Sequence, residues 1–194
     1  MNPSTIMEWD ELNLLRASVP ELLSAYRKAK DRGYVDRWCD YMDFVLCLIY
    51  GYGWKDAEEI VGIVPFKDGL DDKAVNLVIK GETFRDRVKA NLENPPASGD
   101  PTEEILRIID TEAHRDYNTG VYDAAKQSNV HGLKKQWWTM ADGRVRETHD
   151  YIHGMVVGLD DRFYTFDGDS ALHPGDFELP ENNINCRCWI TLAR

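Results

Sequence analysis

The segment "NPPASGDP", Asn94 to Pro101, divides the chain near its middle with three prolines, a serine and a glycine. Prolines end helices because they lack the backbone N–H and restrict the residue before them. Before this segment apolar residues recur at helical spacing, and beyond one further helix the pattern becomes extended and aromatic. We therefore predict an α+β fold with a helical N-terminal region (1–94), a linker (95–100), and a small mixed α/β module with a short antiparallel sheet (101–194).

Several helices are predicted in the N-terminal region. The segment "SVPELLSAYRKAKDRG" has Ser18 as a cap and Gly33 as a stop. In "DRWCDYMDFVLCLIY", apolar residues at three- and four-residue spacing predict a core-facing helix that "GYG" is expected to end. Shorter helices are predicted in "WKDAEEIVG", "DDKAVNLVIKG" and "ETFRDRVKANLEN". Cys39 and Cys47 lie among these helices and are expected to be small core residues, not ligands.

The module is predicted to begin with a long helix, which Asp100 and Pro101 start and which continues to "AAKQSN". Glu112, His114 and Arg115 lie in its middle and are expected to be solvated or paired along the helix surface. Next come a strand in "LKKQWWTM", one or two helical turns in "VRETHDYIHG", a hairpin in "MVVGLDDRFYTFDG" and a closing strand in "NCRCWITLA". Because strand side chains alternate, one of the adjacent tryptophans in "QWWT" should face the core and the other should face outward.

Charge and composition limit the classes of partner. The sequence has 34 acidic and 23 basic residues, a net charge of −11, and no local basic patch, which opposes non-specific binding to nucleic acid. No stretch approaches the roughly 18 apolar residues that cross a bilayer, and the acidic N-terminus does not resemble a signal peptide. We therefore expect no membrane association and four reduced cysteines.

Two cysteines and two histidines form a candidate metal set. Cys186 and Cys188 would share a face of a strand, and His149 and His153 would share a face of a helical turn. Together they could complete a tetrahedral zinc site, although Cys-x-Cys on a regular strand splays its thiolates more than the familiar Cys-x-x-Cys. The competing interpretation is that these are small side chains packed under a sheet, with the histidines as hydrogen-bonding fixtures.

The polar residues around His149 allow two interpretations. Asp142, Arg144, Arg146, His149 and His153 could gather into a site that uses histidine as a general base and arginines to hold an anion. The sequence contains no His-Glu-x-x-His, phosphate-binding glycine loop or nucleophile elbow that would support catalysis. The alternative is that the arginines brace a corner of the fold by binding carbonyls and acids.

The order of these motifs resembles a known family. "TEAHRDYNTG", "WWTMADGRVRETHDYIHG", "RFYTF" and "HPGDFELPENNINCRC" together resemble the phage Mu protein F-like module of phage head morphogenesis (minor head) proteins. The positions that match the family pattern are Thr111, Glu112, Arg115, Asn118, Trp138, Asp142, Arg144, Arg146, His149, Gly154, Phe163, Pro174, Asn185, Cys186, Arg187 and Cys188. His153 departs from the residue that usually precedes the glycine.

The resemblance implies a non-enzymatic minor head protein of a tailed phage, with no cofactor and no catalytic residues. Its expected partners are the portal, capsid and scaffold proteins, with packaged DNA as a weaker one. Its expected location is the host cytoplasm during assembly and then the procapsid or virion. Some relatives carry a toxin domain after the module, but because only five residues follow "CRCW", we expect none in this sequence. The alternatives are a zinc-stabilised binding module and a small hydrolase or nuclease that uses the Arg/His cluster.

Overall fold

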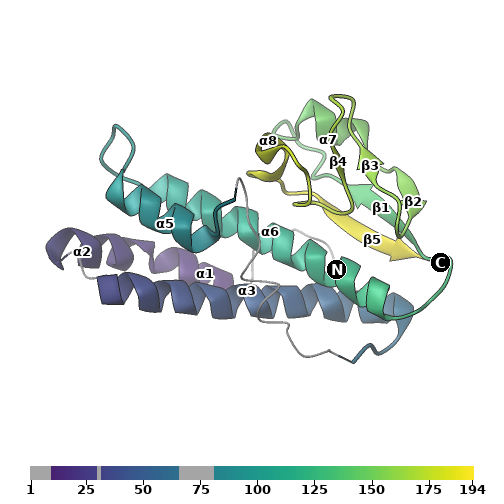
Figure 1. The fold of residues 1–194 in the computed structure, drawn as a ribbon, viewed down its shortest axis with the longest axis horizontal. Coiled ribbons are helices and arrows are strands. Elements are labelled where there is room, and N and C mark those ends of the chain that lie inside the picture. Colours follow the sequence, from purple (N-terminus) through teal and green to yellow (C-terminus); the bar gives the residue numbers. More distant parts are fainter. Residues whose placement is uncertain (1–9, 30–31, 66–80) are drawn as a thin grey trace.

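The computed structural model describes residues 10–29, 32–65 and 81–194. The helices are α1 (Asp10–Ala17), α2 (Val19–Ala29), α3 (Arg32–Val61), α5 (Phe84–Glu93), α6 (Thr102–Gln127), α7 (Glu147–Tyr151) and α8 (Pro180–Asn183). The strands are β1 (Lys134–Trp138), β2 (Val156–Gly158), β3 (Phe163–Tyr164), β4 (Ser170–Ala171) and β5 (Trp189–Ala193). A layer of long helices lies beside a small sheet, and α6 lies between α3 and β5 (Figure 1). The fold is α+β, as predicted.

Helix α3 is longer than the sequence pattern predicts. It continues through "GYG" to Val61, so the predicted stop there is wrong, and the helix predicted in "WKDAEEIVG" forms the C-terminal end of α3. Gly33 does not end a helix either, because it lies in the first turn of α3. The reason for Gly53 is tertiary: a Cβ at this position would lie 2.0 Å from the carbonyl oxygen of Tyr117 on α6. The glycine therefore permits a close helix crossing.

Two helix starts agree with their local signals. Thr83 caps α5 with a capping box, because its side chain accepts from the Asp86 backbone while the Asp86 carboxylate accepts from the Thr83 backbone. At α6 the cap position is Pro101, one residue later than predicted, and Asp100 Oδ1 still accepts from the Thr102 backbone N–H at 3.2 Å. The helix predicted in "DDKAVNLVIKG" lies, apart from its final glycine, outside the described residues. The proposed boundary at 95–100 stays a prediction.

The main sheet is antiparallel with strand order β2-β1-β5. Trp137 faces the core with no exposed surface, and Trp138 is half-buried on the opposite face, so the predicted alternation is confirmed. The predicted hairpin within "MVVGLDDRFYTFDG" is wrong: β2 pairs with β1, whereas β3 pairs with β4 in a separate two-stranded sheet. The turn between β2 and β3 does form, and the Asp161 carboxylate stabilises it by accepting from the Gly158 N–H at 3.1 Å. The strand after the turn, β3, pairs with β4 and not with β2.

Lys135 is the most unusual residue of β1. Its side chain is fully buried beside Trp137, donates to the Leu159 carbonyl at 2.6 Å, and lies over the rings of Tyr122 and Phe163. Burial lowers the pKa of this amine to about 8. No helix in the described part of the chain has both the length and the apolar character needed to cross a membrane.

Candidate functional site

His149, Cys186 and Cys188 meet in the interior of the module. The Nδ1 atom of His149 lies 3.7 Å from Cys186 Sγ and 3.4 Å from Cys188 Sγ, and the three potential ligand atoms lie within 4.8 Å of one another. All three side chains are buried. The two sulfurs thus face one partner, as the sequence predicts, but the cysteines precede β5 and do not lie on it, because that strand begins at Trp189.

His153 does not join this cluster. Helix α7 ends at Tyr151, so the helical spacing that would bring His149 and His153 to one face is lost before His153. The Nδ1 atom of His153 instead accepts from the Thr139 backbone N–H at 3.2 Å, and its ring meets the edge of Trp138. The predicted four-residue metal set is therefore not formed in the described residues, which bring together only three of its members.

Helix α6 fixes the backbone that carries the two cysteines. The Asn118 amide donates to the Cys188 carbonyl at 3.1 Å and accepts from the Ile190 N–H at 3.0 Å. Thr111 Oγ1 accepts from the Asn185 N–H at 3.0 Å, and this contact holds Asn185 in a left-handed conformation with φ of 58°. These bonds satisfy backbone groups that have no partner within a strand, so they define the path of the chain.

Residues near α7 hold the other side of the cysteine segment. The Arg146 guanidinium donates to the Ile184 carbonyl. Gly154 follows α7 with φ of 75° and donates to the Trp137 carbonyl at 2.8 Å, which returns the chain to the sheet. Trp138 Nε1 donates to Thr191 Oγ1 at 2.9 Å, so the half-buried tryptophan ties β1 to β5.

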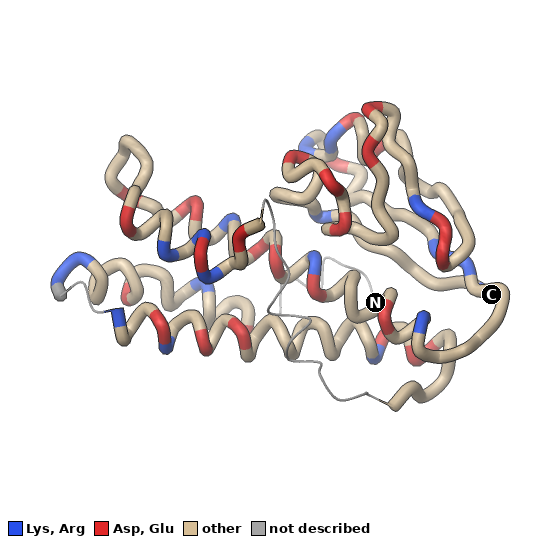
Figure 2. The backbone as a smooth tube through the Cα atoms, in the orientation of Figure 1, with Lys and Arg blue, Asp and Glu red and all other residues tan. Residues whose placement is uncertain are grey.

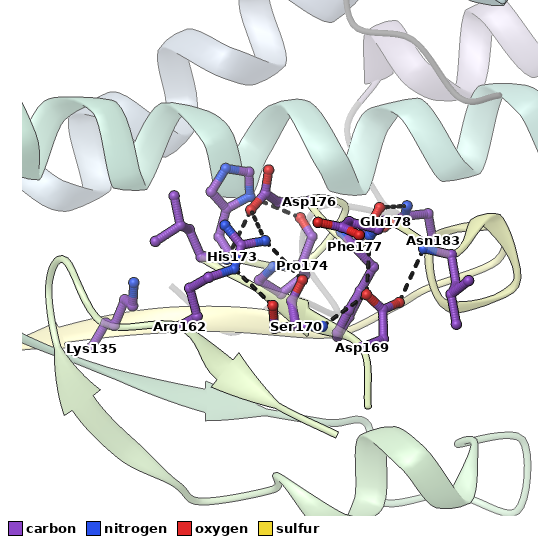
Figure 3. Close-up of polar contacts among 12 residues, drawn as sticks. Lys135, Arg162, Asp169, Ser170, His173, Pro174, Asp176, Phe177, Glu178 and Asn183 are labelled. Carbon is purple, nitrogen blue, oxygen red and sulfur yellow. Dashed lines mark hydrogen bonds and ion pairs between the residues drawn. The ribbon is translucent and has the colours of Figure 1, made fainter. Parts of the chain in front are cut away.

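The loop after β4 places Phe177 against His149. The two rings stack at 18° with centroids 5.1 Å apart, and Trp137 meets His149 edge-on at 5.8 Å. Asn183 exchanges two hydrogen bonds with the Phe177 backbone, at 3.0 and 2.6 Å. The buried Asp169 carboxylate accepts from the backbone N–H groups of Ser170, Glu178 and Leu179, as Figure 3 shows in part. This polar network fixes the aromatic wall of the cluster.

The buried polar face of α6 is the largest departure from expectation. Glu112, His114 and Arg115 were predicted to be solvated or paired along the helix surface. Glu112 and Arg115 do pair along the helix, but all three residues are buried, at 1%, 3% and 3% exposed. Glu112 forms ion pairs with Arg87 of α5 at 2.5 Å and with Arg115 at 3.2 Å. The Arg115 stem packs under Gly175, where a Cβ would lie 2.4 Å from Arg115 Cγ. Tertiary contacts that the helical periodicity does not reveal cover this face.

The arginines flank a polar cavity of about 390 Å³. Its lining residues are Asp110, His114, Arg144, Arg146, Asn185, Cys186 and Arg187. The two terminal guanidinium nitrogens of Arg187 donate to the two carboxylate oxygens of Asp142 at 2.7 and 2.8 Å. This bidentate ion pair lowers the pKa of the Asp142 carboxyl to about 2. Arg144 remains mostly exposed, 3.9 Å from Asp142. Asp142, Arg146 and Arg187 therefore act as braces, as one of the two sequence interpretations predicts.

The two thiols are not equivalent. The contact with Cys188, together with His149, holds the pKa of Cys186 well below its ordinary range despite burial. The same contact and burial raise the pKa of Cys188. The pKa values of the two thiols are thus shifted in opposite directions. Two sulfurs beside one imidazole nitrogen form a donor set suited to a soft divalent metal ion.

Sequence reasoning missed several residues that shape the site. Asp169, Phe177 and Asn183 lie in a segment for which no functional residue was predicted. Lys135 lies in a strand for which only the two tryptophans were predicted to be important. The acidic and amide residues of "DGDS" and "ENN" could have indicated this network, because such side chains often hydrogen-bond nearby backbone groups in turns.

The sequence of the chain is similar to those of two characterised proteins. The chain is 30% identical over 130 residues to the NAD(+)--arginine ADP-ribosyltransferase EFV of Enterococcus faecalis, a match that covers 63% of this chain and 26% of that protein. It is 29% identical over 81 residues to the Minor head protein GP7 of Bacillus phage SPP1, which covers 41% of this chain and 26% of that protein. The chain thus spans about a quarter of the length of each of these relatives. No solved structure gives a significant match.

A family model covers the site itself. It matches residues 68–191, which include α5, α6, β1 to β4, the start of β5, the cysteine segment and every signature position from Thr111 to Cys188. The match extends over more than half of the chain, and the chain belongs to the family of Phage Mu protein F like proteins.

Proposed function

We propose that the chain serves phage head morphogenesis as a minor head protein, a non-enzymatic assembly factor that acts beside the portal inside the procapsid. The observation that carries the proposal is membership of the Phage Mu protein F like family together with the similarity to Minor head protein GP7. The portal, capsid and scaffold proteins are the proposed partners, and the procapsid or virion is the proposed location after assembly in the host cytoplasm.

The use of the signature residues supports a structural role. Glu112, Asn118 and His149 are buried and contact other parts of the same chain. A catalytic residue must reach its substrate, whereas these residues fix the packing of α6, the cysteine segment and α7. The signature therefore preserves the shape of a module whose outer surface is left to bind partners.

The distribution of charge is compatible with work inside a shell that fills with DNA. Acidic and basic residues are interspersed along the tube in Figure 2, and the net charge is −11. Net negative charge disfavours non-specific adhesion to phosphate backbones, so the protein would not be trapped along the genome.

The test is an assembly reaction with and without portal. Coat, scaffold and the chain are co-expressed with the portal protein of the same genome, and a second preparation omits the portal. We expect the chain to co-sediment with portal-containing procapsids and to resist external protease, and we expect it to be depleted from portal-free shells. Equal amounts in both preparations, or complete digestion by protease, would contradict the proposed location.

Enzymatic activity is the second candidate, because one relative is named as an ADP-ribosyltransferase. The match covers only 26% of that protein, and no activity follows from the shared part. The hydrolase alternative needs His149 to act as a base, yet its Nδ1 atom faces two sulfurs. We expect no labelled ADP-ribose on an arginine-containing acceptor protein after incubation with NAD+, and no cleavage of DNA. Transfer by the purified chain would overturn the non-enzymatic assignment.

A further inference from the structure

We propose that His149 Nδ1, Cys186 Sγ and Cys188 Sγ bind one zinc ion in the interior of the module. The site follows from the positions of the three side chains and does not depend on the role in head assembly. The ion would tie α7 to the segment before β5, two parts of the chain that lie far apart in sequence.

The separations of the ligand atoms fit zinc. Zn–S bonds of about 2.3 Å and Zn–N bonds of about 2.0–2.1 Å at tetrahedral angles place nitrogen and sulfur about 3.5 Å apart. The two observed N···S distances, 3.4 Å to Cys188 and 3.7 Å to Cys186, lie on either side of this value. The histidine nitrogen therefore lies at a separation from each sulfur that suits joint coordination of one ion.

The orientation of His149 fixes which ring nitrogen would bind the ion. Its Nδ1 atom faces both sulfurs, whereas its Nε2 atom is buried and has no hydrogen-bond partner among the described residues. A metal at Nδ1 would require the neutral tautomer with the proton on Nε2. The stacked Phe177 ring holds the imidazole in this orientation.

The surrounding hydrogen bonds fix the backbone that carries the thiols. Asn118 binds the carbonyl of Cys188, and Arg146 binds the carbonyl of Ile184, two residues before Cys186. Neither contact involves a sulfur, so the two sulfurs remain turned toward each other and toward His149. Such outer contacts orient ligands in metal sites and are nearly as important as the ligands themselves.

The cluster also has a route for entry and a side for the fourth ligand. Cys186 lines the cavity of about 390 Å³, which is large enough to hold several water molecules. A solvent molecule or small anion from this cavity would complete the coordination, because His153 is engaged by Thr139. Arg144 and Arg146 line the same cavity and would favour an anionic fourth ligand.

Zinc is the metal that this donor set favours. Thiolate sulfur and imidazole nitrogen are the usual protein ligands of zinc, whereas calcium and magnesium require oxygen ligands. Binding is balanced by proton release: the zinc ion replaces the protons of both cysteine thiols, and the imidazole binds in its neutral form.

The test is the metal content of the full chain, expressed without a polyhistidine tag and purified under reducing conditions. We expect about one equivalent of zinc, and a thiolate-to-metal charge-transfer band when cobalt replaces it. Zinc below about a tenth of an equivalent, without a charge-transfer band on adding cobalt to the reduced protein, would overturn the assignment.

Variants identify the ligands. Cys188→Ser and His149→Ala should lower bound zinc at least about tenfold. The matched controls are Cys39→Ser, a buried cysteine elsewhere, and His153→Asn, the nearby histidine outside the cluster, which should both retain the metal. Full zinc occupancy in the Cys188→Ser variant would refute the site. If the ligand variants do not fold, the cobalt spectrum of the unchanged chain decides, because its charge-transfer band requires thiolate ligands.

Discussion

Gly53 and Gly120 bring the backbones of α3 and α6 into direct contact. A Cβ on Gly53 would lie 2.0 Å from the Tyr117 carbonyl oxygen, and a Cβ on Gly120 would lie 2.1 Å from that of Tyr50. The contact is reciprocal because both helices carry the same pattern, Tyr-x-x-Gly-x-x-Asp. Its members are Tyr50, Gly53 and Asp56 on α3, and Tyr117, Gly120 and Asp123 on α6. Each tyrosine hydroxyl donates to the aspartate of the other helix, at 2.9 Å from Tyr50 and 2.6 Å from Tyr117.

Replacing either glycine should separate the two helices. Gly53→Ala and Gly120→Ala would each force a methyl group against a main-chain carbonyl that cannot move as a side chain does. We expect each variant to lower the free energy of unfolding by ~2–3 kcal/mol, measured by urea denaturation. Gly51→Ala is the matched control, since a Cβ there meets nothing within 4 Å and alanine favours the helix by about 0.5–1 kcal/mol. Equal losses at Gly51 and Gly53 would argue against the crossing.

The tyrosine hydroxyls should contribute separately from the glycines. Tyr50→Phe and Tyr117→Phe each remove one hydrogen bond to a carboxylate across the crossing. Bonds to charged groups contribute about 1.5–3 kcal/mol, so each variant should unfold at lower denaturant with an unchanged slope. Tyr164→Phe, on an exposed ring of β3, serves as the control and should change stability by less than about 0.5 kcal/mol. Unchanged midpoints for Tyr50→Phe and Tyr117→Phe would show that the hydroxyls do not stabilise the crossing.

The part of the fold that the sequence predicts is the part that local signals determine. Helix α5, helix α6 and strand β1 follow from capping residues and periodicity, and they form where expected. The stop at "GYG" was predicted wrongly because glycine is read locally as a helix breaker, whereas here it permits contact with a helix more than 60 residues later. The hairpin was predicted wrongly because a turn does not specify which strand pairs with the strand that follows it.

The sequence predicted three members of the candidate site, with His153 as an incorrect fourth, but it did not predict the geometry of the site. The spacing of Cys186 and Cys188 indicated that both thiols face one side, and the spacing of His149 and His153 indicated a shared helical face. Only the first relation holds, because α7 ends before His153. The burial of Glu112 and Arg115 was not predictable, since it depends on Arg87 and Gly175 from distant segments.

Asn118 should be the residue of α6 that matters most for the closing strand. Asn118→Ala would leave the Cys188 carbonyl and the Ile190 N–H without their partner in a buried setting. We expect a loss of ~2–4 kcal/mol in the free energy of unfolding, because each unsatisfied buried group costs about 1–3 kcal/mol. Asn91→Ala removes an amide that donates to the Arg87 carbonyl of its own helix, and it should change stability by less than about 0.5 kcal/mol. Comparable small effects at both positions would show that Asn118 does not anchor β5.

Asp116 should make the stability of the fold depend on pH. Its carboxyl is fully buried and has no hydrogen-bond partner among the described residues, and burial, with Glu112 nearby, raises its pKa well above the ordinary value of 3.8. The folded chain therefore keeps a proton that the unfolded chain releases above about pH 4. This contribution to stability is fully present in acid and is lost as pH rises through the folded-state pKa.

Asp116→Asn replaces the protonated acid with a neutral side chain of the same shape. At pH 4 the variant and the unchanged chain should have similar free energies of unfolding, and by pH 8 the variant should be more stable by ~1–3 kcal/mol. Urea denaturation at several pH values measures the difference in free energy of unfolding between the variant and the unchanged chain. The control is Asp150→Asn, which replaces an exposed carboxylate on α7 and should differ from the unchanged chain by close to zero at each pH. A difference that stays constant from pH 4 to 8 would mean that Asp116 is ionised in the folded protein across this range, and that burial does not hold its proton.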